Sequence, residues 1–105
     1  MNYVEKIKAI SKRINVFGGT TVSFKDSKHI IGFNKYAIGE NYYMFRGFTM
    51  DDKVIGRSDR GEEIRIPLHW LSEMYLYGIY DEYMKACKEQ LSESAYKEIE
   101  KVVAD

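Results

Sequence analysis

The feature of this sequence that most constrains its fold is a change in the spacing of apolar residues along the chain. Residues 3–15 repeat them at intervals of three and four, which is typical of a helix with one buried face. From residue 20 to residue 66 the interval falls to two and polar turn residues interrupt it, as in short strands. Beyond Pro67 the helical interval returns. This order predicts a helix, then a sheet, then further helices.

The first helix is expected over residues 3–15, with Asn2 as its N-cap and the pair Gly18-Gly19 at its end. Its apolar positions form a single stripe, and such a helix must pack against another element to bury that stripe. We expect this element to be the sheet that follows in the sequence.

The sheet is expected to be an antiparallel meander of four to five strands, because turn residues separate the strand segments and no helical stretch lies among them. The longest segment is apolar on both faces, which indicates a central strand. Pro67 ends the pairing because it has no backbone donor. The strand segments are residues 20–24, 29–33, 41–50, 54–57 and 63–66.

Two helices are predicted after the sheet, at residues 73–89 and 93–103. Ser72 and Ser92 stand directly before them, where N-caps are expected. The fold class is therefore α+β, with an N-terminal helix, an antiparallel β-meander of four to five strands and two C-terminal helices. At this length we expect a single domain over residues 1–105.

Two residues of the longer C-terminal helix are unusual. Gly78 lies in its interior, where glycine costs roughly 1 kcal/mol relative to alanine, and we interpret it as a site of close approach by the last helix or by another chain. Cys87 is the only cysteine, so an intramolecular disulfide and an all-cysteine zinc site are excluded. Its place on the apolar face of the helix indicates core packing rather than a nucleophile.

The composition is that of a folded globular domain, with 45% hydrophobic residues, 30% charged residues and one proline. No stretch approaches the roughly 20 apolar residues of a membrane span. The first residues lack the apolar core of a signal peptide. We therefore expect a cytoplasmic protein without a membrane partner, located in the host cytosol if a phage encodes it.

The formal charge is zero overall but is unevenly distributed. Residues 1–35 carry seven basic and two acidic residues, a net charge of +5, so the remainder carries −5. A basic segment of this kind either meets an anionic partner or neutralises the acidic part of the fold. Together with the aromatic central strand it predicts a candidate site for single-stranded nucleic acid. The residues of this site are Lys25, Lys28, Lys35, Tyr42, Tyr43 and Arg46.

Aromatic side chains are abundant, and tyrosine alone occurs nine times. The helix after Pro67 is apolar around more of its circumference than packing against one sheet requires. The first and last helices could cover the additional surface. Because tryptophan, tyrosine and methionine are enriched at protein interfaces, we instead expect a protein-binding surface here. Its candidate residues are Trp70, Met74, Tyr75, Tyr77 and Met84.

Catalytic chemistry has weaker support in the sequence. His69 precedes Glu73 by four residues, and such a pair can act as a base or bind a metal, but no third ligand follows at a recognisable spacing. Acidic residues gather between residues 51 and 63. A nuclease of the two-carboxylate-plus-lysine type would require a lysine where Arg65 stands. We expect no cofactor and no metal.

The preferred hypothesis is a non-enzymatic protein that binds either a second copy of itself or a host or partner protein, as an inhibitor or adaptor. Phage and mobile-element inhibitors are proteins of this type, although the analogy rests on no particular residue. The alternative hypothesis is a single-stranded nucleic-acid-binding module. A small hydrolase or nuclease that uses His69 and the carboxylates is the third.

Overall fold

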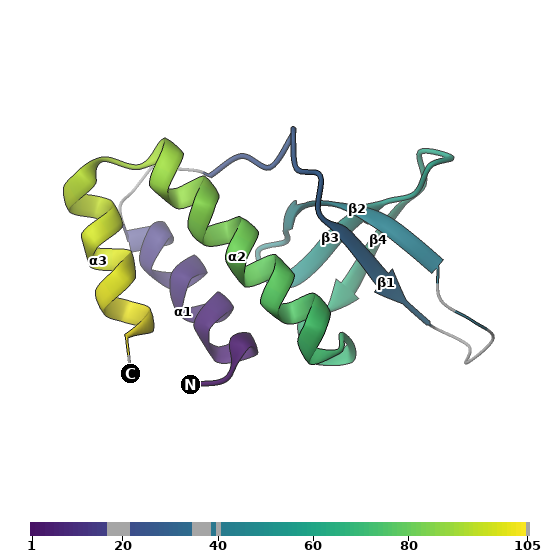
Figure 1. Ribbon diagram of the computed structural model, residues 1–105, viewed down its shortest axis with the longest axis horizontal. Coiled ribbons are helices and arrows are strands. Elements are labelled where there is room, and N and C mark those ends of the chain that lie inside the picture. Colours follow the sequence, from purple (N-terminus) through teal and green to yellow (C-terminus); the bar gives the residue numbers. More distant parts are fainter. Residues whose placement is uncertain (17–21, 35–38, 40, 105) are drawn as a thin grey trace.

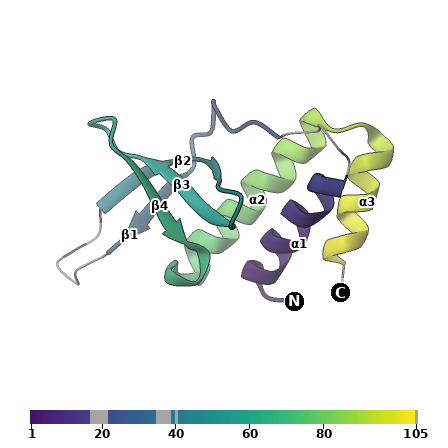
Figure 2. The ribbon, with the colours of Figure 1, turned by 180° about the vertical axis from the view of Figure 1, so that it is seen from behind.

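The computed structural model describes residues 1–16, 22–34, 39 and 41–104. Figures 1 and 2 show a helix, a four-stranded antiparallel sheet and two C-terminal helices, which confirms the predicted α+β fold class. Among the described helices, none has the length and apolar character required to cross a membrane. The elements are α1 (Tyr3–Val16), β1 (Ile30–Phe33), β2 (Asn41–Phe48), β3 (Lys53–Arg57), β4 (Glu63–Pro67), the short 3₁₀ helix η1 (Leu68–Trp70), α2 (Glu73–Gln90) and α3 (Glu93–Val103).

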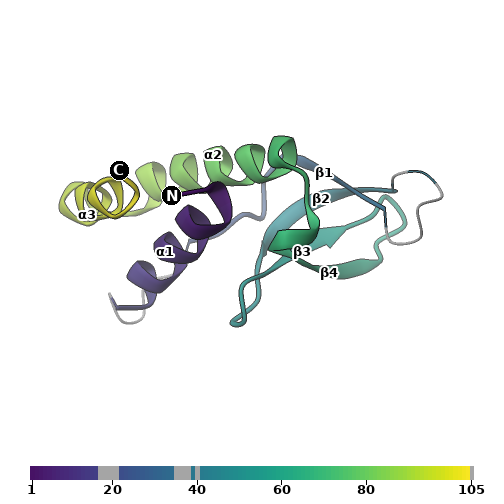
Figure 3. The ribbon, with the colours of Figure 1, turned by 90° about the horizontal axis from the view of Figure 1, so that it is seen from below.

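The sheet is a meander in which the strands lie in their sequence order, β1-β2-β3-β4. The register between β2 and β3 shifts at a bulge between Phe45 and Gly47. Gly47 has a φ of 143° there, a conformation that side chains other than glycine rarely adopt. One face of the sheet carries the buried residues Ile31, Phe45, Val54 and Ile66. We call the opposite face, which no described helix covers, the outer sheet face (Figure 3).

The long helix α2 lies at the centre of the molecule. Figure 3 shows its N-terminal part beside the sheet and its C-terminal part beside α1 and α3. Tyr83 of α2 stacks on Phe48 of β2 at 4.9 Å between ring centroids. Contrary to our expectation, α1 packs mainly against α2 and α3 rather than against the sheet. The apolar stripe of α1 is therefore buried between helices, with Ile7 and Ile10 fully inaccessible.

Residues 20–24 were expected to form a strand, but Val22–Phe24 are outside the sheet, and residues 20 and 21 lie outside the described residues. The side-chain amide of Gln90 takes the place of a neighbouring strand. Its Oε1 accepts from the Ser23 N–H at 2.7 Å, and its Nε2 donates to the Ser23 carbonyl at 2.8 Å. Phe24 is buried beside Phe45, with ring centroids 4.7 Å apart. The segment Val22–Phe24 is therefore hydrogen-bonded to a side chain in the last turn of α2 rather than to a neighbouring strand.

Gly78 is explained by His29. A Cβ placed on Gly78 would lie 2.1 Å from Cε1 of His29, so the imidazole ring occupies the space next to the bare helix backbone. The close approach predicted from the sequence is present, but the element that makes it is the segment leading into β1 rather than α3 or another chain.

Two of the three predicted N-caps form side-chain hydrogen bonds. The Asn2 carboxamide accepts from the Glu5 N–H at 2.8 Å, and the Ser92 hydroxyl accepts from the Ala95 N–H at 3.2 Å. Ser72 occupies the N-cap position of α2 without a side-chain cap hydrogen bond. Local capping therefore fixes the start of α1 and of α3, while α2 depends more on tertiary packing.

Candidate protein interface

Three large side chains protrude from the region where the sheet passes into α2. Trp70 at the end of η1 is 55% exposed, and Met74 and Tyr77 in the first half of α2 are 68% and 52% exposed. We call these three residues the α2 patch. Met74 and Tyr77 are three residues apart on the helix, so they lie on the same face. This face points away from the core, because Leu76 and Ile79 on the other side of α2 are buried.

The two rings of the α2 patch are held in place by rings from other elements. Trp70 stacks on Phe33 of β1, with centroids 5.7 Å apart and planes within 12°. Tyr77 meets Tyr3 of α1 edge to face at 5.5 Å. Such contacts restrict the rotamers of both exposed rings, so a binding partner would meet anchors with little conformational freedom left to lose.

The other two predicted interface residues, Tyr75 and Met84, are half-buried and pack against the core. The sequence pattern could not separate them from the α2 patch, because it does not reveal how many neighbours surround the helix. The sheet lies on one side of α2 and the helices α1 and α3 lie on another (Figure 3), and the burial of side chains along α2 leaves only part of its circumference exposed. The predicted set is therefore divided between the surface and the margin of the core.

The polar groups along α2 limit the α2 patch to the first half of the helix. Asp81 lies one turn after Tyr77 and pairs with Lys85 at 2.9 Å. This exposed ion pair contributes little to stability, but it makes the continuation of the helix face polar. An apolar patch with a polar border is the usual arrangement of a protein-binding surface.

Among the groups considered for catalysis, His69 and Cys87 have different surroundings. His69 is exposed and lies edge-on to Trp70 at 6.1 Å. Burial raises the pKa of the Cys87 thiol to about 12, so the thiolate required of a nucleophile is disfavoured. Within the described residues, no three His, Cys, Asp or Glu side chains lie close enough together to hold a metal ion.

Comparison with protein-family models, curated proteins and solved structures found no match to this chain. The functional assignment therefore depends on the chemistry of its own surfaces.

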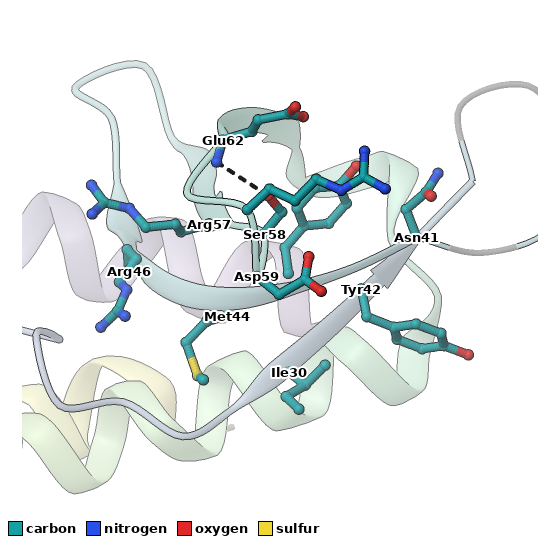
Figure 4. A pocket seen from close by; sticks show the side chains of 11 residues that line it. Ile30, Asn41, Tyr42, Met44, Arg46, Arg57, Ser58, Asp59 and Glu62 are labelled. Carbon is teal, nitrogen blue, oxygen red and sulfur yellow. Dashed lines mark hydrogen bonds between the residues drawn. The ribbon is translucent and has the colours of Figure 1, made fainter.

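A second exposed region lies on the outer sheet face, where Figure 4 shows a shallow hollow between β2 and the turn that joins β3 to β4. Its volume is about 680 Å³, and apolar side chains and arginines line it together. Asp59 and Glu62 also border the hollow, so its charge is mixed. The apolar and basic lining residues are Ile30, Tyr42, Tyr43, Met44, Arg46, Arg57 and Arg60.

The structure brings together only part of the predicted nucleic-acid site. Arg46 donates a hydrogen bond to the carbonyl of Lys25, which places these two residues side by side. Tyr42 is 60% exposed on the outer sheet face, whereas Tyr43 packs against Gly56 on the face toward the core. Successive strand residues point to opposite faces, so the two tyrosines cannot stack bases together.

The remaining predicted residues of this site add little to the hollow. Lys28 is exposed on the segment before β1, and Lys35 lies outside the described residues. Arg57 and Arg60 were missed by sequence reasoning, although they line the hollow beside Tyr42. For Arg57 the signal was available, because its alternation with the buried Val54 and Gly56 places it on the outward face of β3.

Proposed function

We propose that this chain is a non-enzymatic binding protein that docks to another protein through the α2 patch. The single observation behind the proposal is the exposure of three large side chains, Trp70, Met74 and Tyr77, within eight residues of the chain. Burying a large apolar side chain stabilises a complex by about 1.5–3 kcal/mol relative to leaving it in water. Tryptophan and tyrosine are also the residue types most enriched among those that dominate binding energies.

The partner in this proposal is a second copy of the chain or a different protein, on which the chain acts as an inhibitor or an adaptor. We place this activity in the cytoplasm, including a host cytosol. The buried unpaired thiol of Cys87 suits a compartment in which cysteines stay reduced.

The test compares three single variants of the full chain: Trp70→Ala, Tyr77→Ala and the control Tyr42→Ala. Tyr42 is as exposed as Tyr77 but lies on the outer sheet face. Light scattering of the pure protein and affinity capture from its native cytosol report self-association and partner binding. We expect both α2-patch variants to lose the interaction while Tyr42→Ala retains it. Equal binding by all three, or a wild-type monomer that captures nothing, would overturn the proposal.

A second candidate function, binding of single-stranded nucleic acid, is favoured by the hollow on the outer sheet face. There Tyr42 offers a ring for base stacking, and Arg46, Arg57 and Arg60 could neutralise phosphates. The expected result is salt-sensitive binding of a fluorescent oligonucleotide that Tyr42→Ala and Arg57→Ala weaken and Tyr77→Ala does not. No binding at low salt would eliminate this candidate.

A further inference from the structure

The strand β4 is an edge of the sheet, since β3 is its only neighbour in the strand order. In Figures 2 and 3 no other described helix or strand runs along its outer side. An edge strand presents backbone donors and acceptors that another strand can pair with. This surface is separate from the α2 patch.

The hydrogen-bond pattern identifies which residues of β4 face the open edge. The Ser58 N–H donates to the Glu62 carbonyl at 2.9 Å, which makes them a hydrogen-bonded pair at the hairpin turn. Hydrogen-bonded and non-hydrogen-bonded pairs alternate along an antiparallel ladder. The pair Gly56↔Ile64 is therefore hydrogen-bonded, and Arg57↔Glu63 is not. It follows that the backbone groups of Glu63 and of Arg65, two residues further on, point to the open edge.

The exposed side chains of this edge are complementary to themselves. If a second β4 pairs antiparallel about a two-fold axis at Ile64, Glu63 of each copy lies opposite Arg65 of the other. Both residues have outward-facing backbone groups, so each such pair exchanges two N–H···O bonds. Opposite charges that face each other across strands stabilise the pairing.

Other two-fold axes are disfavoured. An axis at Glu63 places that carboxylate opposite itself, and an axis at Arg65 does the same with the guanidinium; like charges directly opposite are destabilising. Within one chain, Glu63 is 3.9 Å from Arg57 and 4.0 Å from Arg65, the outer limit of ion pairing. Its carboxylate can therefore form a closer pair with a second copy. Charged side chains on an edge strand usually oppose pairing with another strand. In this register, however, each carboxylate of Glu63 lies opposite a guanidinium of Arg65.

We propose that β4 is a self-association edge that joins two copies of the chain into one continuous sheet, with Ile64 on the two-fold axis. The partner is a second copy of this chain. Pro67 has no backbone donor and ends β4, so the paired stretch is short. The association is therefore weak and favoured at high protein concentration. The inference does not depend on the proposed function of the α2 patch.

Disulfide trapping tests the axis directly. In a non-hydrogen-bonded antiparallel pair the Cα atoms are about 4.5 Å apart, within the range of about 4.4–6.8 Å that a disulfide spans. We expect Ile64→Cys to form a disulfide-linked dimer under mild oxidation. The control is Glu63→Cys, which is more exposed but does not lie opposite itself in this register. Equal or greater cross-linking of the control would indicate random collision and overturn the proposal.

Charge exchange tests the register. In the Ile64→Cys background, Arg65→Glu places carboxylates opposite each other and should reduce cross-linking several-fold. The double exchange Glu63→Arg/Arg65→Glu restores opposite pairs and should restore cross-linking. Circular dichroism verifies that each variant is folded, which is expected because both side chains are exposed. Loss without recovery in the double variant, or no loss at all, would overturn the register.

Trp70→Ala should leave cross-linking unchanged, which separates this result from that of the α2 patch.

Discussion

Two groups of large apolar side chains lie on different sides of α2 and have different surroundings. On the sheet side, Phe24, Phe45, Phe48 and Tyr83 contact one another at ring distances of 4.7–6.0 Å. On the other side, the α2 patch has comparable side chains that remain half or more exposed. The first group stabilises the fold by excluding water. The second is held by its neighbours but has no cover in the described chain, so its apolar area remains available for binding.

The largest expected effect is on the buried group. Phe45 is fully buried and contacts both Phe24 and Phe48. We expect Phe45→Ala to lower the free energy of unfolding by about 3–5 kcal/mol, because a cavity replaces the ring. Urea denaturation followed by circular dichroism measures this. A loss below about 1 kcal/mol would show that the cluster is not the core of the fold.

The contact between Gly78 and His29 gives the next largest effect. Gly78→Ala forces a methyl group into the imidazole and should cost about 1–3 kcal/mol of unfolding free energy. In a His29→Ala background the same change should instead stabilise the protein by up to about 1 kcal/mol, because alanine favours helix over glycine. Urea unfolding of the four proteins measures both. An equal cost in both backgrounds would contradict the contact.

The titration of His29 should produce a smaller change, visible as a pH dependence of stability. Burial lowers the pKa of His29 from 6.5, although Glu82, a hydrogen bond to the Tyr75 backbone and Asp81 oppose the shift. As the pH falls below about 6.5 the unfolded chain takes up a proton before the folded chain does, so stability decreases. We expect the unfolding free energy to fall between pH 7 and pH 5, and the slope to be smaller in His29→Gln. An identical slope in the variant would exclude His29 as the cause.

The smallest effect on stability is expected in the α2 patch. Met74 is largely exposed, so Met74→Ser should change the unfolding free energy by no more than about 0.5 kcal/mol. Thermal and urea unfolding check this value. A loss of several kcal/mol would place Met74 in the core and remove the contrast between the two groups of side chains.

Local sequence patterns predicted the elements but not every contact between them. The helical and strand intervals located α1, α2, α3 and all four strands, because these intervals depend on which faces are buried. Residues 20–24 had the pattern of a strand. However, the backbone of Ser23 is hydrogen-bonded to the side chain of Gln90, 67 residues away, and not to another strand. Such a long-range substitution leaves no local signal.

The candidate interface was predictable in part for a similar reason. The sequence predicted Trp70, Met74 and Tyr77 because the segment after Pro67 contains more aromatic and methionine residues than a single buried stripe requires. Tyr75 and Met84 have the same chemistry but lie beside packed neighbours. The sequence alone does not show which sides of α2 its neighbours cover, and this coverage separates the two sets.

The central claim, that the α2 patch is a binding surface, is tested most directly by oxidative footprinting of Met74 and Trp70 in the associated and the isolated protein. Trp70 is the only tryptophan, and the fully exposed Met50 lies in a turn outside the patch and serves as an internal reference. The prediction is that oxidation of Met74 and Trp70 decreases several-fold in the complex while oxidation of Met50 stays unchanged. Unaltered oxidation of Met74 and Trp70 in a complex that has demonstrably formed would contradict it.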